Sequence, residues 1–226
     1  MPELSPTNKE IKVWDLPVRL FHWTLVLLFA VSWASAEIGD NMTIHFYSGY
    51  AVLALVLFRV LWGIFGSTTA RFAHFLRGYR AAKDYAVALK ENRAIAPIGH
   101  NPLGGWMVML MLTFLLVQAG TGLFANDDVS TEGPLYHLIS KDVSDILTEI
   151  HEVSFNILLA LVGVHIAAVL YYRFIKRDNL VTPMITGRKS LVSDAPEPDI
   201  RFVGGWLALL LFGLAAGAVA LLVING

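Results

Sequence analysis

Five long apolar segments constrain the fold of this chain more than any other feature. They run approximately over residues 17–36, 42–65, 103–124, 150–174 and 202–224. Each is long enough to cross a hydrocarbon core that takes about 20 helical residues. Uninterrupted runs such as LALVLF and MLMLTFLLV lack the alternation of a membrane β-strand. With 56% hydrophobic and 15% charged residues, the sequence predicts an all-α integral membrane protein.

Basic residues lie on one side of these spans. With the N-terminus in the cytoplasm, every Lys and Arg except Lys141 falls on the inner side. The positive-inside rule therefore predicts a multi-pass protein of the bacterial cytoplasmic membrane with an N-in, C-out topology. The outer side is acidic, and we expect it to attract a basic soluble partner rather than nucleic acid. These acidic residues are Glu37 and Asp40 in the first short loop and, between the third and fourth spans, Asp127, Asp128, Glu132, Asp142, Asp145 and Glu149.

Two segments outside the spans have patterns of their own. Residues 67–92 (STTARFAHFLRGYRAAKDYAVALKEN) interleave aromatic and basic side chains. This pattern predicts an amphipathic helix that lies on the anionic lipid of the inner leaflet. Residues 175–201 are polar and contain Pro183, Pro196 and Pro198, which predicts a loop.

Two histidines of the fourth span, His151 and His165, lie fourteen residues apart. Fourteen helical residues fall only about 40° short of four turns and rise about 21 Å, so both rings leave one face of the helix at different depths. His45 near the outer start of the second span and His22 near the inner start of the first can supply partners. The topology therefore pairs His45 with His151 near the outer surface and His22 with His165 near the inner one.

Paired imidazoles at two depths predict two b-type haems, each held by two axial histidines inside a four-helix bundle. The chain has no cysteine, which excludes attachment through C-x-x-C-H, so both haems would be noncovalent. Gly49, four residues after His45, would let a macrocycle approach the second span closely. For any single histidine, the alternatives are a polar contact between helices or a proton relay.

Three polar residues near the inner surface extend this pattern. Arg59 stands fourteen residues after His45, so it would reach the inner site and neutralise a haem propionate, or else snorkel to the headgroups. His100 and Asn101 open the sequence GHNPLGG before the third span. They are candidates for binding a quinone headgroup, and the alternative is an ordinary helix start with Asn101 as N-cap. The two other histidines are expected outside the haem sites, His74 on the amphipathic helix and His137 in an outer loop.

The sequence also resembles a known family. The motifs VWDLPVRLFHW, HFYSGY, FRVLWGIFGS, ARF, GHNPLGG and IHEVSFNILLALVGVH are similar to those of the bacterial cytochrome b561 and Ni/Fe-hydrogenase b-type cytochrome superfamily, over about residues 12–190. The resemblance places that family's four haem ligands on His22, His45, His151 and His165. In related formate dehydrogenase and hydrogenase membrane subunits, quinone binds beside the cytoplasmic haem, where His100 and Asn101 look like the corresponding positions.

This resemblance implies a division of the chain. Residues 1–190 are expected to form the di-haem transmembrane domain, and residues 191–226 a linker and a fifth transmembrane helix. Four-helix members of the family lack this last helix, so its role stays open.

The leading hypothesis is electron transfer through two haems between the membrane quinone pool and a periplasmic redox partner. A cytochrome c or a hydrogenase-like subunit would dock on the acidic outer face. The resemblance also allows a superoxide:quinone oxidoreductase, although an acidic face would repel superoxide. A non-redox membrane anchor is the third alternative, and whether the chain is an enzyme stays open.

Overall fold

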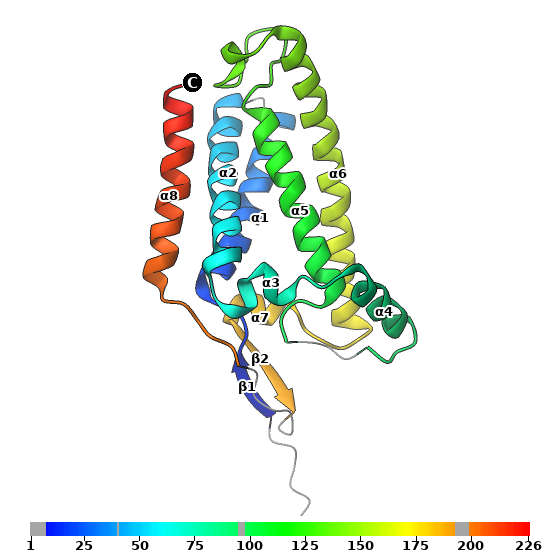
Figure 1. Ribbon diagram of the computed structural model, residues 1–226. Helices are drawn as coiled ribbons and strands as arrows, with labels where there is room; N and C mark the ends of the chain where they lie inside the picture. Colours follow the sequence, from blue (N-terminus) through cyan, green and yellow to red (C-terminus); the bar gives the residue numbers. More distant parts are fainter. Residues whose placement is uncertain (1–7, 40, 95–97, 193–198) are drawn as a thin grey trace, which may run out of the picture.

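Five long helices run side by side in the computed structural model (Figure 1), which describes residues 8–39, 41–94, 98–192 and 199–226. Each is long and apolar enough to cross a membrane, in agreement with the five predicted spans. Three residues named in the sequence analysis lie outside the described residues: Asp40, Pro196 and Pro198. The five helices are α1 (Leu16–Glu37), α2 (Met42–Phe65), α5 (Pro102–Gly122), α6 (Lys141–Phe174) and α8 (Gly205–Ile224).

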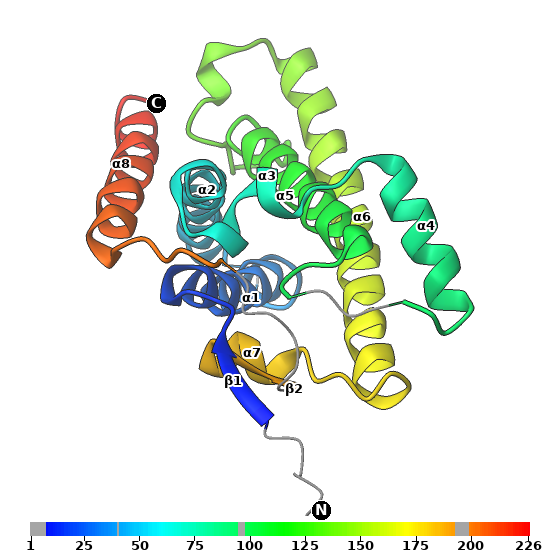
Figure 2. The same ribbon diagram turned by 60° about the horizontal axis from the view of Figure 1, so that its bottom comes forward.

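Four of these helices form a bundle, and the fifth lies outside it. Helix α2 packs on α1, α5 and α8, whereas the main packing partner of α6 is α5. In the view of Figure 2, α1, α2, α5 and α6 surround a common interior while α8 stands beside α2. Helix α8 buries one face, spaced by three or four residues, and leaves most of its apolar surface for lipid. The buried residues of α8 are Ala208, Leu211, Ala215 and Val219.

Helix α6 is longer than the span that it contains. It begins at Lys141, nine residues before the predicted start at residue 150, and its 34 residues extend over about 50 Å. Its first turn is stabilised by Asp142, which complements the helix dipole, and by the Lys141–Asp145 ion pair of 2.8 Å. Asp142, Asp145 and Glu149, which the sequence places between the third and fourth spans, therefore lie on the first turns of α6.

The segment between α2 and α5 contains short helices instead of one long amphipathic helix. A 3-10 turn, η1 (Thr68–Ala70), leads into α3 (Phe72–Phe75), and α4 (Tyr79–Lys90) follows. The chain is extended at Leu76 and Gly78, which separates the two helices. Helix α4 packs on α5 and carries most of the predicted amphipathic pattern.

The predicted loop over residues 175–201 is wrong in part. Helix α7 (Val181–Thr186) and strand β2 (Arg188–Val192) occupy it, and β2 pairs antiparallel with β1 (Asn8–Lys12). Gly187 joins α7 to β2 with a φ of +81°, a conformation that glycine adopts without strain. Its carbonyl accepts hydrogen bonds from the N–H groups of Val13 and Trp14. The partner strand lies about 180 residues away in sequence, so local pattern gave no signal for the pairing.

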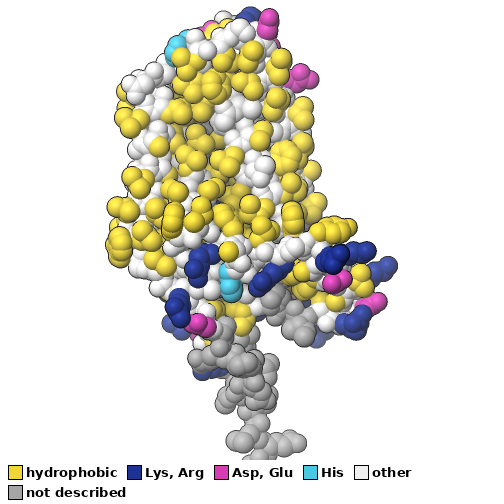
Figure 3. All heavy atoms as spheres, viewed as in Figure 1, with side chains coloured by type: hydrophobic (Ala, Val, Ile, Leu, Met, Phe, Trp, Pro, Cys, Tyr) yellow, Lys and Arg dark blue, Asp and Glu magenta, His cyan; other side chains and the backbone are white. Residues whose placement is uncertain are grey.

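Charge is unequally distributed along the bundle. Figure 3 shows hydrophobic side chains over the middle of one face, and Lys and Arg side chains gathered at the end that carries the sheet and α4. An apolar band with basic residues at one end is the charge pattern on which the positive-inside rule is based.

The start of α1 depends on Asp15. One carboxylate oxygen accepts a 2.9 Å hydrogen bond from the N–H of Val18 and caps the helix. The other accepts a 3.0 Å bond from Nε1 of Trp62, whose side chain is fully buried. Asp15 thus joins the N-terminus of α1 to the core of α2.

Replacing Asp15 by alanine removes the cap and leaves a buried indole N–H without its acceptor. We expect Asp15→Ala to destabilise the protein by about 2 kcal/mol or more, measured by chemical unfolding in detergent micelles with circular dichroism. Asp84→Ala, on the exposed face of α4, is the matched control and should leave stability nearly unchanged. Equal stability of the two variants would contradict this role of Asp15.

Candidate functional site

The outer histidine pair lies between α2 and α6. The ring centres of His45 and His151 are 6.2 Å apart, with an angle of 75° between the ring planes. His45 Nδ1 lies 2.9 Å from the carbonyl oxygen of Ser32 on α1, and His151 Nδ1 lies 2.8 Å from that of Gln118 on α5. Because a carbonyl oxygen only accepts, each Nδ1 must carry the proton. Each Nε2 is then the unprotonated nitrogen that can bind a metal.

A cavity of about 270 Å³ surrounds this pair and is lined by residues of all four bundle helices. Gly49 lines it, and a Cβ at Gly49 would meet no atom within 4 Å. At Gly122, by contrast, a Cβ would lie 2.8 Å from Cε1 of His151. Glycine at position 122 is therefore required for the observed position of the His151 ring.

Gln118 also contacts the second nitrogen of His151. Its side-chain amide nitrogen lies 2.9 Å from His151 Nε2, while its amide oxygen accepts a hydrogen bond from Ser154. A metal on Nε2 would replace the first of these bonds. The bond between His151 Nδ1 and the Gln118 main-chain carbonyl is compatible with ligation and would orient the ring.

The inner histidine pair lies between α1 and α6. The ring centres of His22 and His165 are 6.5 Å apart, with 55° between their planes. His22 Nδ1 is buried and has no hydrogen-bond partner among the described residues. Phe29 and Phe155 stack across the same two helices, with ring centres 5.9 Å apart. Along both helices this aromatic pair falls between the levels of the inner and outer histidines.

Arg59 lies inside the protein rather than at its surface. Only 3% of the residue is exposed, and its guanidinium stands 5.1 Å from the centre of the Phe72 ring. Its Nη1 is buried without a hydrogen-bond partner among the described residues. Enclosure by protein contradicts the snorkelling alternative. A buried cation with an unpaired N–H is suited to an anionic partner.

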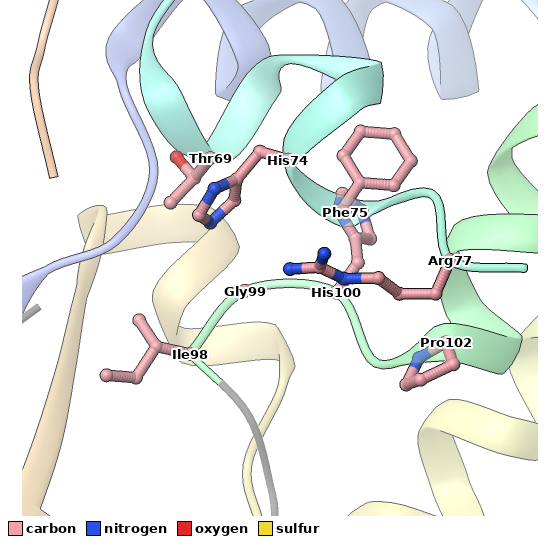
Figure 4. Close-up of a pocket in the computed structure, with 8 residues that line it drawn as sticks. All are labelled: Thr69, His74, Phe75, Arg77, Ile98, Gly99, His100 and Pro102. Atoms are coloured by element: carbon pink, nitrogen blue, oxygen red, sulfur yellow. The ribbon is translucent and has the colours of Figure 1, made fainter. Parts of the chain in front are cut away.

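His100 borders a second cavity at the inner end of the bundle. This cavity of about 150 Å³ lies beneath α3, and Figure 4 shows His74, Arg77 and His100 among its lining residues. The His100 ring packs between Trp14 and Phe75, with centre distances of 4.7 and 4.6 Å. Its Nδ1 is buried without a hydrogen-bond partner in the described part of the chain.

Burial, together with the positive charge of Arg59 and the nearby His165, lowers the pKa of His100 to about 3. The imidazole is therefore neutral at physiological pH. A neutral ring offers one N–H donor and one acceptor nitrogen, so His100 can bind a carbonyl or hydroxyl group.

Asn101 is occupied by structural contacts. Its side-chain oxygen accepts a 2.7 Å bond from the N–H of Gly104 and caps α5, which begins at Pro102. Its side-chain nitrogen donates to the Tyr172 hydroxyl at 3.0 Å. Asn101 does not line the cavity beside His100, and its helix-capping alternative is confirmed.

The other two histidines lie away from both pairs. His137 is in the short 3-10 turn η2 (Tyr136–Leu138), in the segment between α5 and α6. His74 is on α3, where its side chain is exposed and lines the inner cavity.

Comparison with known proteins decides the family. A family model described as prokaryotic cytochrome b561 matches residues 13–187. The chain belongs to the prokaryotic cytochrome b561 family. Two curated relatives are each named a probable Ni/Fe-hydrogenase B-type cytochrome subunit. One, from Rhizobium leguminosarum bv. viciae, is 26% identical over 223 residues, covering 83% of this chain and 92% of the relative. The other, from Azotobacter vinelandii, is 25% identical over 224 residues, covering 83% and 91%.

No solved structure matches the chain. Family membership makes it a membrane b-type cytochrome and implies haem b as its cofactor.

The two histidine pairs of this cytochrome b561 fit haem iron. A metal–imidazole bond is about 2 Å long, so two rings that share one iron have centres about 6 Å apart. The observed separations of 6.2 and 6.5 Å agree with this value. The outer pair also borders an open cavity, and the inner level holds a buried, unpaired guanidinium nitrogen.

Sequence reasoning missed the groups that support the outer pair. Gln118 is a polar residue within an apolar span, and its position could have drawn attention. Ser32 contacts His45 through its main-chain carbonyl. Every residue has such a carbonyl, so the amino-acid sequence gives no sign of this contact. Two more polar side chains lie beside His151 and Gln118. The Thr121 hydroxyl lies 3.4 Å from His151 Nδ1, and the Ser154 hydroxyl donates to the Gln118 side-chain oxygen.

Substitution of Gly122 tests the orientation of His151. In Gly122→Ala, the new methyl group must displace the ring and its bond to the Gln118 carbonyl. We expect the affinity of the outer site for haem to fall about 10- to 100-fold, measured by haem titration of the haem-depleted protein. Gly120→Ala is the control because a Cβ there meets no atom within 4 Å. Equal affinity in both variants would show that the Gly122 contact is unimportant.

Proposed function

We propose that this cytochrome b561 carries electrons across the membrane through two haems, one at each histidine pair. The observation that carries this proposal is the presence of two facing pairs, at ring separations that suit iron, on helices that share one bundle. Bound haem supplies one-electron chemistry, because its iron cycles between the ferrous and ferric states. His45 and His151 would hold the outer haem, and His22 and His165 the inner one.

Other residues would orient the haems and accommodate their acidic groups. Ser32 and Gln118 fix the ring orientation and tautomer of the outer ligands through main-chain carbonyls. Gly49 leaves space beside His45. Arg59, buried at the inner level with an unpaired Nη1, would neutralise a propionate there.

We propose quinone as the substrate at the inner end. The cavity beside His100 is lined by both apolar and polar groups, which suits the ring and the carbonyl of a quinone headgroup. His100 would donate a hydrogen bond to a quinone oxygen, since its ring is neutral and its Nδ1 is unpaired. Asn101 would act only by fixing the start of α5 beside this cavity.

We propose a hydrogenase-type subunit as the partner at the outer end. The relatives named as probable Ni/Fe-hydrogenase cytochrome subunits support this choice, as do the acidic side chains around the outer loop. An N-in, C-out orientation would place that end in the periplasm, in accord with the charge distribution. The acidic end favours a basic protein partner over superoxide.

Removal of single ligands tests the pairing. We expect His45→Ala and His165→Ala each to lose one of two haems, because one remaining imidazole holds the cofactor weakly. Haem per chain is measured from the pyridine haemochrome absorbance and the protein concentration. His137→Ala, in the outer loop, is the control and should keep both haems. Retention of two haems in the ligand variants would contradict the proposed function.

Substitution of His100 tests the quinone site separately. In His100→Phe, the ring packing is kept and the hydrogen bond is lost. We expect kcat/KM for quinone reduction to fall about five- to tenfold, the effect of one hydrogen bond, with haem content unchanged. His137→Phe serves as the control. Unchanged quinone kinetics would remove His100 from the site.

A further inference from the structure

We propose that His74 carries protons between the water at the basic end of the bundle and the quinone cavity beside His100. The inference rests on the proposed quinone site and adds to it the residue that exchanges protons with solvent. Reduction of a quinone to a quinol takes up two electrons and two protons, with one proton added to each carbonyl oxygen. The electrons would arrive one at a time from the inner site, and the protons would come from water at this end.

His74 and His100 border one cavity from two different elements. His74 is on α3 (Phe72–Phe75), and His100 lies in the segment that leads into α5. Figure 4 shows the His74 ring directed from α3 toward Gly99 and His100. His74 is exposed to solvent, whereas Nδ1 of His100 is buried. The wall of the cavity therefore carries one imidazole that meets water and one that is enclosed.

Contacts between α3 and the segment before α5 hold the two histidines at this cavity. Phe75, next to His74 in sequence, is buried and packs on the His100 ring with ring centres 4.6 Å apart. The segment turns at Gly99, whose φ of +88° is a conformation that glycine adopts without strain. The position of His74 relative to His100 is therefore fixed by packing.

Among the described residues, the charged groups around His74 are arginines. Arg71 and Arg77 flank α3 in sequence, and Arg59 reaches α3 from α2. His100 is the titratable group across the cavity. Neither η1 nor α5, which also pack on α3, contains a titratable side chain.

These surroundings make His74 a ready proton donor. Burial and the positive charges of Arg77 and Arg71 lower the pKa of its imidazole below the usual value. The ring is therefore neutral in most molecules at pH 7 and can take a proton from water. Its protonated form is a stronger acid than an ordinary imidazolium, which favours release of the proton toward the cavity.

Other charged groups near the cavity are unsuited to this transfer. Arg77 lines the cavity, but a guanidinium stays protonated in proteins. Asp15 is only 3% exposed, and its two oxygens accept hydrogen bonds from Val18 N–H and Trp62 Nε1–H. Its carboxylate therefore has little contact with water.

A chain of hydrogen bonds from α4 also fails to reach the cavity. The hydroxyls of Tyr85 and Tyr172 lie 3.1 Å apart, and the Asn101 amide nitrogen donates to Tyr172 at 3.0 Å. An amide nitrogen donates hydrogen bonds but does not take up a proton, so this chain cannot pass one to His100. In the described part of the chain, His74 is the cavity-lining group that both meets water and titrates near neutral pH.

Loss of the His74 ring tests the transfer. In His74→Ala, we expect the rate of reduction of a saturating short-chain benzoquinone at pH 7 to fall about tenfold or more, because a positioned acid–base group contributes at least this much. The haem-loaded protein is reduced, freed of excess reductant and mixed with the quinone, and haem absorbance is followed by stopped flow. Imidazole in the buffer should restore part of the rate. His137→Ala, between α5 and α6, is the control and should keep the full rate without imidazole.

The pH dependence separates proton transfer from a structural role. In the unmodified protein, the rate should fall as the pH rises through the pKa of His74, because the protonated ring is the donor. This midpoint should lie below the usual pKa of an imidazole and should disappear in His74→Ala. Arg77→Gln removes a positive neighbour, so it should move the midpoint to higher pH. Histidine NMR of the isotope-labelled protein, in which His74 gives the signal lost in His74→Ala, measures the same pKa independently.

The outcomes separate the two proposals. A lower rate in His74→Ala that imidazole restores, with loss of the midpoint, would support the assignment. A full rate in this variant, or a lower rate with an unchanged midpoint and no response to imidazole, would overturn the role of His74 and leave the quinone site in place. Failure of the unmodified, haem-loaded protein to reduce the quinone would overturn the quinone site itself.

Discussion

The structure depends on the placement of polar rings inside an apolar bundle. A histidine surrounded by hydrocarbon loses its hydration, so each ring nitrogen needs a partner within the protein. For the outer pair the chain supplies main-chain carbonyls of Ser32 and Gln118 as partners for Nδ1. The same bonds leave Nε2 unprotonated, the form that can bind a metal. One set of hydrogen bonds thus both compensates the burial of the rings and fixes their orientation.

Helix α5 supports the histidine pairs although it contributes none of their four histidines. It packs along α6 and presents Gln118, Thr121 and Gly122 to His151. Helix α6 packs chiefly on α5. The space between α6 and the other two bundle helices is the outer cavity, which residues of α1 and α2 also line. A flat macrocycle needs such a separation between ligand helices, and close packing throughout the bundle would have removed it.

The five spans and the histidine pairs could be predicted because they follow from hydrophobicity and helical geometry. His151 and His165 share a helix face through their spacing alone, and the charge distribution places His45 and His22 at matching ends. Contacts made by the main chain were not predictable, such as the carbonyl of Ser32, because residue type does not report them. The β1–β2 pairing was also missed, since it joins distant segments, and the extension of α6 was missed because its first turns are polar and resemble a loop.

The two-stranded sheet joins the chain before α1 to the chain after α7. Lys12 pairs with Arg188, and the segment that matches the family, residues 13–187, lies between these two partners. The segment that matches the family therefore begins and ends at neighbouring positions, next to the paired strands β1 and β2. Helix α8 follows this segment and packs chiefly on α2, so its addition or removal would leave the paired ends of the family segment in place.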